Sequence, residues 1–133
     1  MKKRIMVSLG ALLLLATAVA YAQQTPIEVK APIDFAFMVE GKLMPAGTYD
    51  FKRSDDGMSF RVQGVGEEAK KGVLAVVITR IAGEMRDLKK GAYLVFDNVG
   101  DTNTLSEIWF PGEDGYLVGI TKVKHMHKMV HME

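Results

Sequence analysis

The 133-residue chain carries 17 Lys and Arg side chains against 16 Asp and Glu, so its formal net charge is only +1. This balance is not that of a protein that binds a polyanion, and we predict no nucleic-acid partner. Cysteine is absent. Its absence excludes disulfides, thiolate metal sites and cysteine catalysis, so packing alone must stabilise the fold.

The first 22 residues have the pattern of a secretory signal. Lys2-Lys3-Arg4 precedes an apolar run over residues 5–20, and Ala20-Tyr21-Ala22 offers the small residues that a signal peptidase requires. The alternative is an uncleaved membrane anchor, but the run is shorter than the roughly 20 apolar residues that span a bilayer. We therefore expect a signal helix over residues 1–22 and export to the periplasm or the extracellular space, with no membrane span in the mature protein.

The part of the chain after residue 22 has the size of a single domain. It contains 111 residues, with 14 basic and 16 acidic side chains, enough to bury a core of its own. We divide the sequence into a signal peptide (1–22), a β-domain (23–121) and a C-terminal tail rich in His, Met and Lys (122–133).

A β-hairpin is the first element predicted after the signal. Period-two alternation over residues 33–40 indicates a strand with one apolar face. That face would carry Ile33, Phe35, Phe37 and Val39. Gly41-Lys42 permits a tight reversal, and residues 48–53 form the returning arm, with Tyr49 and Phe51 on its apolar face.

A second hairpin and a more apolar strand follow. Residues 54–57, Ser-Asp-Asp-Gly, have the composition of a turn, and residues 58–63 again alternate. Residues 73–81 are apolar on both faces over most of their length and rich in β-branched side chains. We expect this last segment to be a central strand that is covered on both sides.

Three more strand-like segments complete the chain, at residues 92–96, 105–110 and 116–121. Short strands with frequent turns predict an all-β fold, a small antiparallel β-sandwich or barrel of about seven to eight strands after the signal helix. Aromatic side chains inside strands with apolar neighbours are expected in the core. These are Tyr49, Tyr93, Trp109 and Tyr116.

Four strings carry a resemblance to known proteins. They are Pro32-Ile-Asp-Phe-Ala-Phe37, Gly41-Lys-Leu-Met-Pro-Ala-Gly-Thr-Tyr49, Leu94-Val-Phe96 and Gly100-Asp-Thr-Asn-Thr-Leu-Ser-Glu-Ile-Trp109. Together they resemble a group of small exported bacterial β-proteins with the signature F-x-V-x-G-K-x-L-P-A-G-x-Y. The resemblance implies export and β structure, and it implies no catalytic residue because the group has no established activity.

Signals for catalysis are weak, and we predict that the protein is not an enzyme. No serine has the context of a nucleophile elbow, and all three histidines fall within the last nine residues. One polar connection offers oxygen ligands of the kind that Ca²⁺ prefers, although its spacing is not that of an EF-hand. These residues are Asp97, Asn98, Asp101 and Asn103.

The most unusual stretch is the tail, residues 122–133. In an extended strand its ligand-bearing side chains would point to one side, whereas in a helix His127 and His131 would lie one turn apart. Imidazole suits Cu(II), Ni(II) and Zn(II), and a thioether suits Cu(I). The candidate metal ligands, for Cu or Zn in particular, are His125, His127, His131 and Met129.

Two other interpretations of the tail remain. It can be a solvated or structural end, in which Val123 and Val130 continue the last strand. Alternatively, Lys122, Lys124 and Lys128 can attract an anionic surface.

Three functions are compatible with these patterns. The first is an exported, non-enzymatic binding or interaction module whose partner is an unknown protein or surface. The second is a periplasmic protein that binds a transition metal (Cu, Zn or Ni) through the His/Met tract. The third is a β-barrel that holds a small apolar ligand in its interior.

Overall fold

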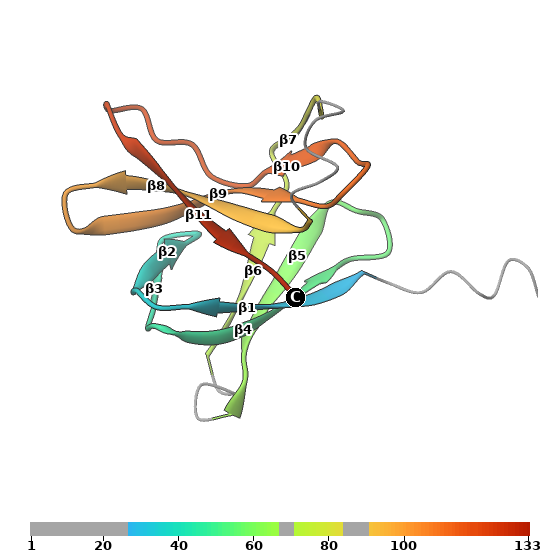
Figure 1. Cartoon of the computed structure of the whole chain (residues 1–133), viewed down its shortest axis with the longest axis horizontal. Coiled ribbons are helices and arrows are strands. Elements are labelled where there is room, and N and C mark those ends of the chain that lie inside the picture. Colours follow the sequence, from blue (N-terminus) through green and yellow to red (C-terminus); the bar gives the residue numbers. More distant parts are fainter. Residues whose placement is uncertain (1–26, 67–70, 84–90) are drawn as a thin grey trace, which may run out of the picture.

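The computed structural model describes residues 27–66, 71–83 and 91–133, and these contain eleven β-strands in two sheets (Figure 1). The all-β fold class is therefore confirmed. The expected signal helix over residues 1–22 lies outside the described residues. Within the described ranges, no helix is long and apolar enough to cross a membrane.

The first sheet has four antiparallel strands in the order β1-β4-β5-β6. Their bounds are β1 Glu28–Ile33, β4 Gly47–Arg53, β5 Ser59–Gly64 and β6 Gly72–Val76. Alternate side chains of each strand point to opposite faces, so one face is apolar and buried and the other carries charges such as Lys52 and Arg61. The buried face of β4 is formed by Tyr49 and Phe51, as the sequence predicts.

The second sheet follows the order β11-β8-β9-β10-β7, with every neighbouring pair antiparallel. Its strands are β7 Thr79–Ile81, β8 Tyr93–Val99, β9 Thr102–Trp109, β10 Gly115–Leu117 and β11 Met126–His131. A small hairpin, β2 (Phe37–Val39) with β3 (Lys42–Met44), joins this sheet because Met38 pairs in parallel with Thr104 of β9.

The two sheets are joined along both sides. On one side β6 of the first sheet leads through Val77 and Ile78 into β7 of the second, and the Ile78 N–H donates to the Leu117 carbonyl at 2.7 Å. On the other side Lys30 of β1 and Glu133 exchange two backbone hydrogen bonds, of 2.8 and 3.1 Å. The fold is thus a sandwich whose layers are connected through the backbone at both edges.

The predicted first hairpin is correct in its faces and wrong in its pairing. Ile33, Phe37 and Val39 are buried as expected. However, residues 33–40 do not form one arm: β1 pairs with β4 in the first sheet, while β2 turns at Glu40 and Gly41, both with positive φ, into β3. Period-two burial identifies the inward face of a segment, but it does not identify the strand beside it.

The segment 73–81 was expected to be a central, doubly covered strand, and this prediction is wrong. The chain there divides into β6 and β7, which lie at the ends of the two sheets, and Leu74 and Val76 are about half exposed. Side chains from the β2–β3 hairpin occupy part of the open edge: the Glu40 carboxylate accepts the Val76 N–H at 3.1 Å, and the Lys42 ammonium donates to a β6 carbonyl at 2.9 Å. These contacts protect a strand whose composition alone would favour a central position.

Aromatic rings fill the space between the sheets. Phe37 makes edge-to-face contacts with Tyr49 and Phe96, at centroid distances of 5.1 and 5.4 Å. Phe60 does the same with Tyr116 at 4.9 Å. Tyr49 and Tyr116 belong to this core, and Tyr93 and Trp109 are buried in a second cluster with Val95, so the expectation that all four are buried is confirmed.

Replacement of Phe60 by Ala tests this packing. Phe60 is fully buried between the sheets, so we expect Phe60→Ala to lower the free energy of unfolding by about 3–5 kcal/mol in urea denaturation. The nearby Met58 is exposed, and Met58→Ala should change it by no more than about 0.5 kcal/mol. Equal effects of the two substitutions would contradict the described core.

The turn before β5 gives a prediction about pH. The Asp56 carboxylate accepts hydrogen bonds from Ser54 Oγ at 2.6 Å and from the Met58 N–H at 3.0 Å. These bonds, the one from Ser54 first, favour the charged form and hold the pKa of Asp56 below its ordinary value of 3.8. Because the folded pKa is lowered, the stabilisation is complete above pH 3.8 and is lost as the pH falls through the folded pKa.

We therefore expect Asp56→Ala to be less stable than the wild type at pH 7, with a difference that shrinks in acid. Urea midpoints measured from pH 7 down to pH 2.5 give this comparison, and Asp55→Ala in the same turn is the control. If the urea midpoint of Asp56→Ala stays below that of the wild type by the same amount over this pH range, the charge of Asp56 does not stabilise the turn.

Candidate metal site

The histidines lie in and next to an ordered edge strand. Residues 122–133, expected as a tail, contain β11, which pairs with β8 from Met126↔Asn98 to His131↔Tyr93 (Figure 1, red). One face of β11 packs inward, where Val130 joins the core. His127, Met129 and His131 are therefore on the outer face, as the extended version of the prediction requires.

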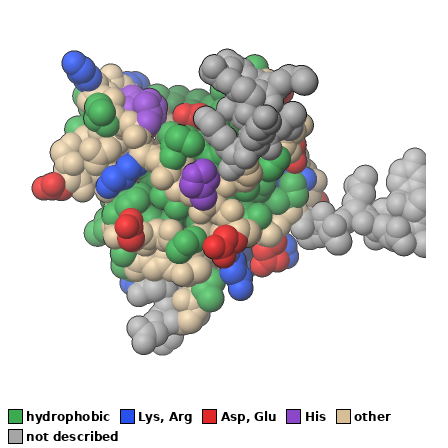
Figure 2. Space-filling model, in the orientation of Figure 1, with side chains coloured by type: hydrophobic (Ala, Val, Ile, Leu, Met, Phe, Trp, Pro, Cys, Tyr) green, Lys and Arg blue, Asp and Glu red, His purple; other side chains and the backbone are tan. Residues whose placement is uncertain are grey.

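The register of β11 on β8 brings a carboxylate to two of these histidines. Asp97 of β8 stands directly opposite His127 and is only 3% exposed. Its Oδ1 atom lies 3.4 Å from His127 Nδ1 and 3.3 Å from His125 Nε2. The three potential ligand atoms all lie within 4.8 Å of one another. Histidine side chains reach the surface on the face shown in Figure 2.

One oxygen of the Asp97 carboxylate, Oδ1, is buried without a hydrogen bond from the described residues. Its distances to the imidazole nitrogens exceed the roughly 2.7–2.9 Å of a charged N–H···O bond. A buried, unsatisfied carboxylate oxygen is costly. A positive charge between Oδ1 and the two rings, on a proton or on a metal ion, would remove this cost.

The orientation of His125 is compatible with a metal ion. Its Nδ1 lies 2.8 Å from the Val123 carbonyl oxygen, and because a carbonyl only accepts, Nδ1 carries the hydrogen. A neutral His125 ring then presents its Nε2 lone pair to the Asp97 carboxylate, which is repulsive unless a cation lies between them. A ring nitrogen bound to a backbone carbonyl is also the usual arrangement of a histidine that ligates metal through its other nitrogen.

The two separations from the Asp97 oxygen agree with this assignment. With metal–nitrogen and metal–oxygen distances of about 2.0–2.2 Å, two ligands of a tetrahedral ion lie about 3.3–3.5 Å apart. The observed separations from Asp97 Oδ1 are 3.3 and 3.4 Å. Asp97, His125 and His127 can thus act as three ligands of one late transition-metal ion.

Of the four predicted ligands, the structure brings two together. His131 lies four positions beyond His127 in β11, about 13 Å along an extended strand, which is too far to share an ion. Its ring instead makes an edge-to-face pair with the Tyr93 ring, with 6.5 Å between the ring centroids, and Tyr93 stacks on Trp109. Met129 lies between the two histidines on the same face.

Asp97 was considered only as part of a calcium-binding connection. In the structure Asp97 and Asn98 are consecutive residues of β8 and point to opposite faces, and the Asn98 amide donates to Asn103 Oδ1 at 2.8 Å. The oxygens of this segment therefore do not converge. The signal available in the sequence was an acidic residue at the end of the apolar run Tyr93-Leu-Val-Phe.

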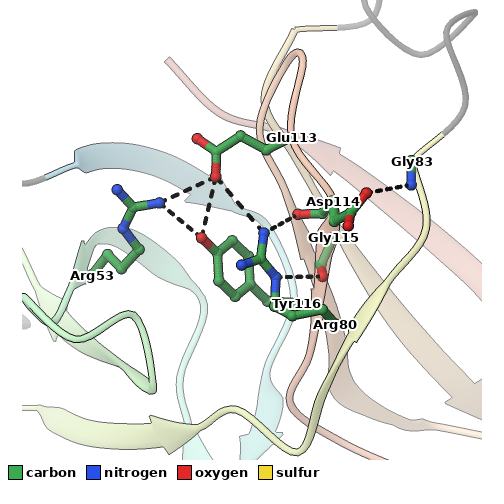
Figure 3. A network of polar contacts seen from close by, with 7 residues as sticks. All are labelled: Arg53, Arg80, Gly83, Glu113, Asp114, Gly115 and Tyr116. Carbon is green, nitrogen blue, oxygen red and sulfur yellow. Dashed lines mark hydrogen bonds and ion pairs between the residues drawn. The ribbon is translucent and has the colours of Figure 1, made fainter.

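A second polar cluster, drawn in Figure 3, connects the two sheets. Arg53 of β4 donates to Glu113 at 3.1 Å and to the Tyr116 hydroxyl at 2.7 Å. Arg80 lies 3.8 Å above the Tyr116 ring and donates to the Asp114 carbonyl at 2.7 Å. Both guanidinium groups lie within ion-pair distance of the Glu113 carboxylate, so the cluster is a structural link between the sheets.

Comparisons with known proteins add no information on function: no family model, no curated protein and no solved structure matches the chain. The geometry around Asp97 therefore carries the functional argument.

Replacement of Asp97 by Leu distinguishes the two positive charges that can neutralise the Asp97 carboxylate, a protonated imidazole and a metal ion. If the metal-free protein holds an unsatisfied carboxylate, Asp97→Leu should be as stable as the wild type or more stable when both are unfolded by urea in the presence of a chelator. Asp97→Asn, which keeps the shape without the charge, is the control. A loss of about 3–5 kcal/mol for Asp97→Leu would instead indicate a buried ion pair with protonated imidazole.

Proposed function

We propose that the protein is an exported, non-enzymatic module that binds a late transition-metal ion, of the class Cu, Zn or Ni, through Asp97, His125 and His127. One observation carries this proposal. The buried Oδ1 atom of Asp97 lacks a hydrogen bond from the described residues and lies at ligand spacing from two imidazole nitrogens. The bound ion would link strand β8 to strand β11.

The ligand chemistry is consistent with export. Residues 1–22 have the charge and hydropathy pattern of a secretory signal. The site consists of nitrogen and oxygen donors, and the chain has no cysteine. Such a site is insensitive to thiol oxidation, which suits an oxidising compartment.

The surroundings of the ion favour binding and exchange. Three protein ligands leave one coordination position open, and His127 is 57% exposed on its side-chain surface. Solvent can therefore reach the ion. We propose no catalytic step, since reversible metal binding needs none.

An apolar ligand inside the fold receives less support. The space between the sheets is filled by aromatic rings, such as Phe37 against Tyr49. A groove of about 540 Å³ lined by Pro32, Thr48 and Met129 opens at the surface between β1, β4 and β11. We therefore propose a metal ion as the ligand of this module.

Titration of the purified protein with Zn(II) and with Cu(II), in competition with a chromophoric chelator, tests the proposal. We expect one ion per chain for the wild type and an affinity at least about tenfold lower for His125→Ala and for His127→Ala. His131→Ala removes the same chemical group from the same strand face outside the site and should retain the wild-type affinity.

Two results would overturn the proposal. One is the absence of stoichiometric binding by the wild type. The other is an equal loss in His127→Ala and His131→Ala, because binding would then be a property of the whole His-rich segment.

The fluorescence of Trp109 gives an independent signal, because it is the single tryptophan of the chain. Trp109 pairs with Tyr93, which lies four positions, or about 13 Å, along β8 from Asp97. Cu(II) bound at the site should therefore quench the fluorescence of Trp109.

A further inference from the structure

The three-ligand site has an open side next to a sulfur donor. A tetrahedral ion held by Asp97, His125 and His127 has one remaining position. On β8, the neighbours of Asp97 on the same face are Val95 and Val99, which offer no donor atom. On β11, the next residue on the face of His127 is Met129.

Met129 is close to the site along the strand. Two positions along a strand correspond to about 6.6–6.8 Å between Cα atoms, and methionine carries its sulfur at the end of a flexible, unbranched chain. Met129 is also 46% exposed, so its side chain is not locked in the core. The inference requires a rotamer of Met129 that turns the thioether towards the site.

A thioether changes which ion the site prefers. Imidazole and carboxylate ligands suit Cu(II), Zn(II) and Ni(II), whereas a thioether is a soft ligand that selects Cu(I). We infer that Met129 is the specificity-determining ligand of the site and that the protein binds copper as Cu(I) as well as Cu(II). This inference rests on the proposed metal-binding function and names the ion.

The chain contains a matched control in the same strand. Met126 is also a methionine of β11 and is more exposed than Met129, at 72% against 46%. It pairs with Asn98 and lies an odd number of positions from His127, so it points to the opposite face. A general effect of exposed methionines would include Met126, whereas a ligand effect would be confined to Met129.

The experiment compares Met129→Leu with Met126→Leu, because leucine preserves volume and apolar character. Cu(I) affinity is measured without oxygen in competition with a chromophoric Cu(I) chelator, and Zn(II) affinity is measured in parallel. We expect Met129→Leu to weaken Cu(I) binding by about tenfold or more and to leave Zn(II) binding unchanged. Met126→Leu should match the wild type for both ions.

X-ray absorption of the Cu(I)-loaded protein gives a structural readout. A copper–sulfur contribution should be present in the wild type and in Met126→Leu, and absent in Met129→Leu. Circular dichroism and an unchanged urea midpoint verify that each variant is folded.

The outcomes distinguish this inference from the function on which it rests. Cu(I) affinity that is the same in Met129→Leu and in the wild type overturns the role of Met129, and so does an equal loss in both methionine variants. In either case Zn(II) and Cu(II) binding that still depends on His125 and His127 leaves the proposed function standing. A wild type that binds none of these ions overturns both.

Discussion

The candidate site depends on the register between β8 and β11. Side chains alternate with period two, so a slip of one residue would turn His127 away from Asp97 and bring Lys128 or Met126 in its place. The inward face of β11 holds the register: Val130 packs in the core, and Lys128 places its ammonium 4.4 Å from the centroid of the Phe35 ring. Burial on one face of the strand thereby positions the histidines on the other.

The same register creates an energetic conflict at Asp97. The sandwich is stabilised by aromatic packing between its sheets and by backbone pairing at both edges, as between Lys30 and Glu133. None of this requires a carboxylate at the β8–β11 seam, where Oδ1 is buried without a hydrogen bond from the described residues. Local violations of good packing are expected where a site serves a ligand. A bound cation would convert this violation into a link between the edge strand and its neighbour.

Two parts of the chain show how much of the fold could be predicted from the sequence. The inward faces of residues 33–40 and 48–53 were predictable because burial alternates locally, residue by residue. The pairing of β1 with β4 was not, since it depends on where the chain crosses between sheets. The edge position of residues 73–81 was not predictable for a similar reason. An apolar run does not show that the Glu40 carboxylate will accept a hydrogen bond from a backbone N–H at the open edge of this strand.

The site was predictable to a similar extent. The alternation of His125, His127 and Met129 in one extended segment is visible in the sequence, and so is their affinity for late transition metals. The third candidate ligand, Asp97, is separated from His127 by thirty residues and comes close only through strand pairing. His131 offers the same imidazole ligand, but in an extended strand it lies too far from His127 to share an ion. In a helix the two histidines would have been one turn apart.

Anomalous diffraction from crystals of the protein grown with Zn(II) or Cu(II) tests the central claim most directly. The account predicts one peak between β8 and β11, about 2.0–2.2 Å from Asp97 Oδ1, His125 Nε2 and His127 Nδ1. A peak at His131 or elsewhere on the surface, or no peak while Asp97 stays bound to two protonated imidazoles, would contradict it.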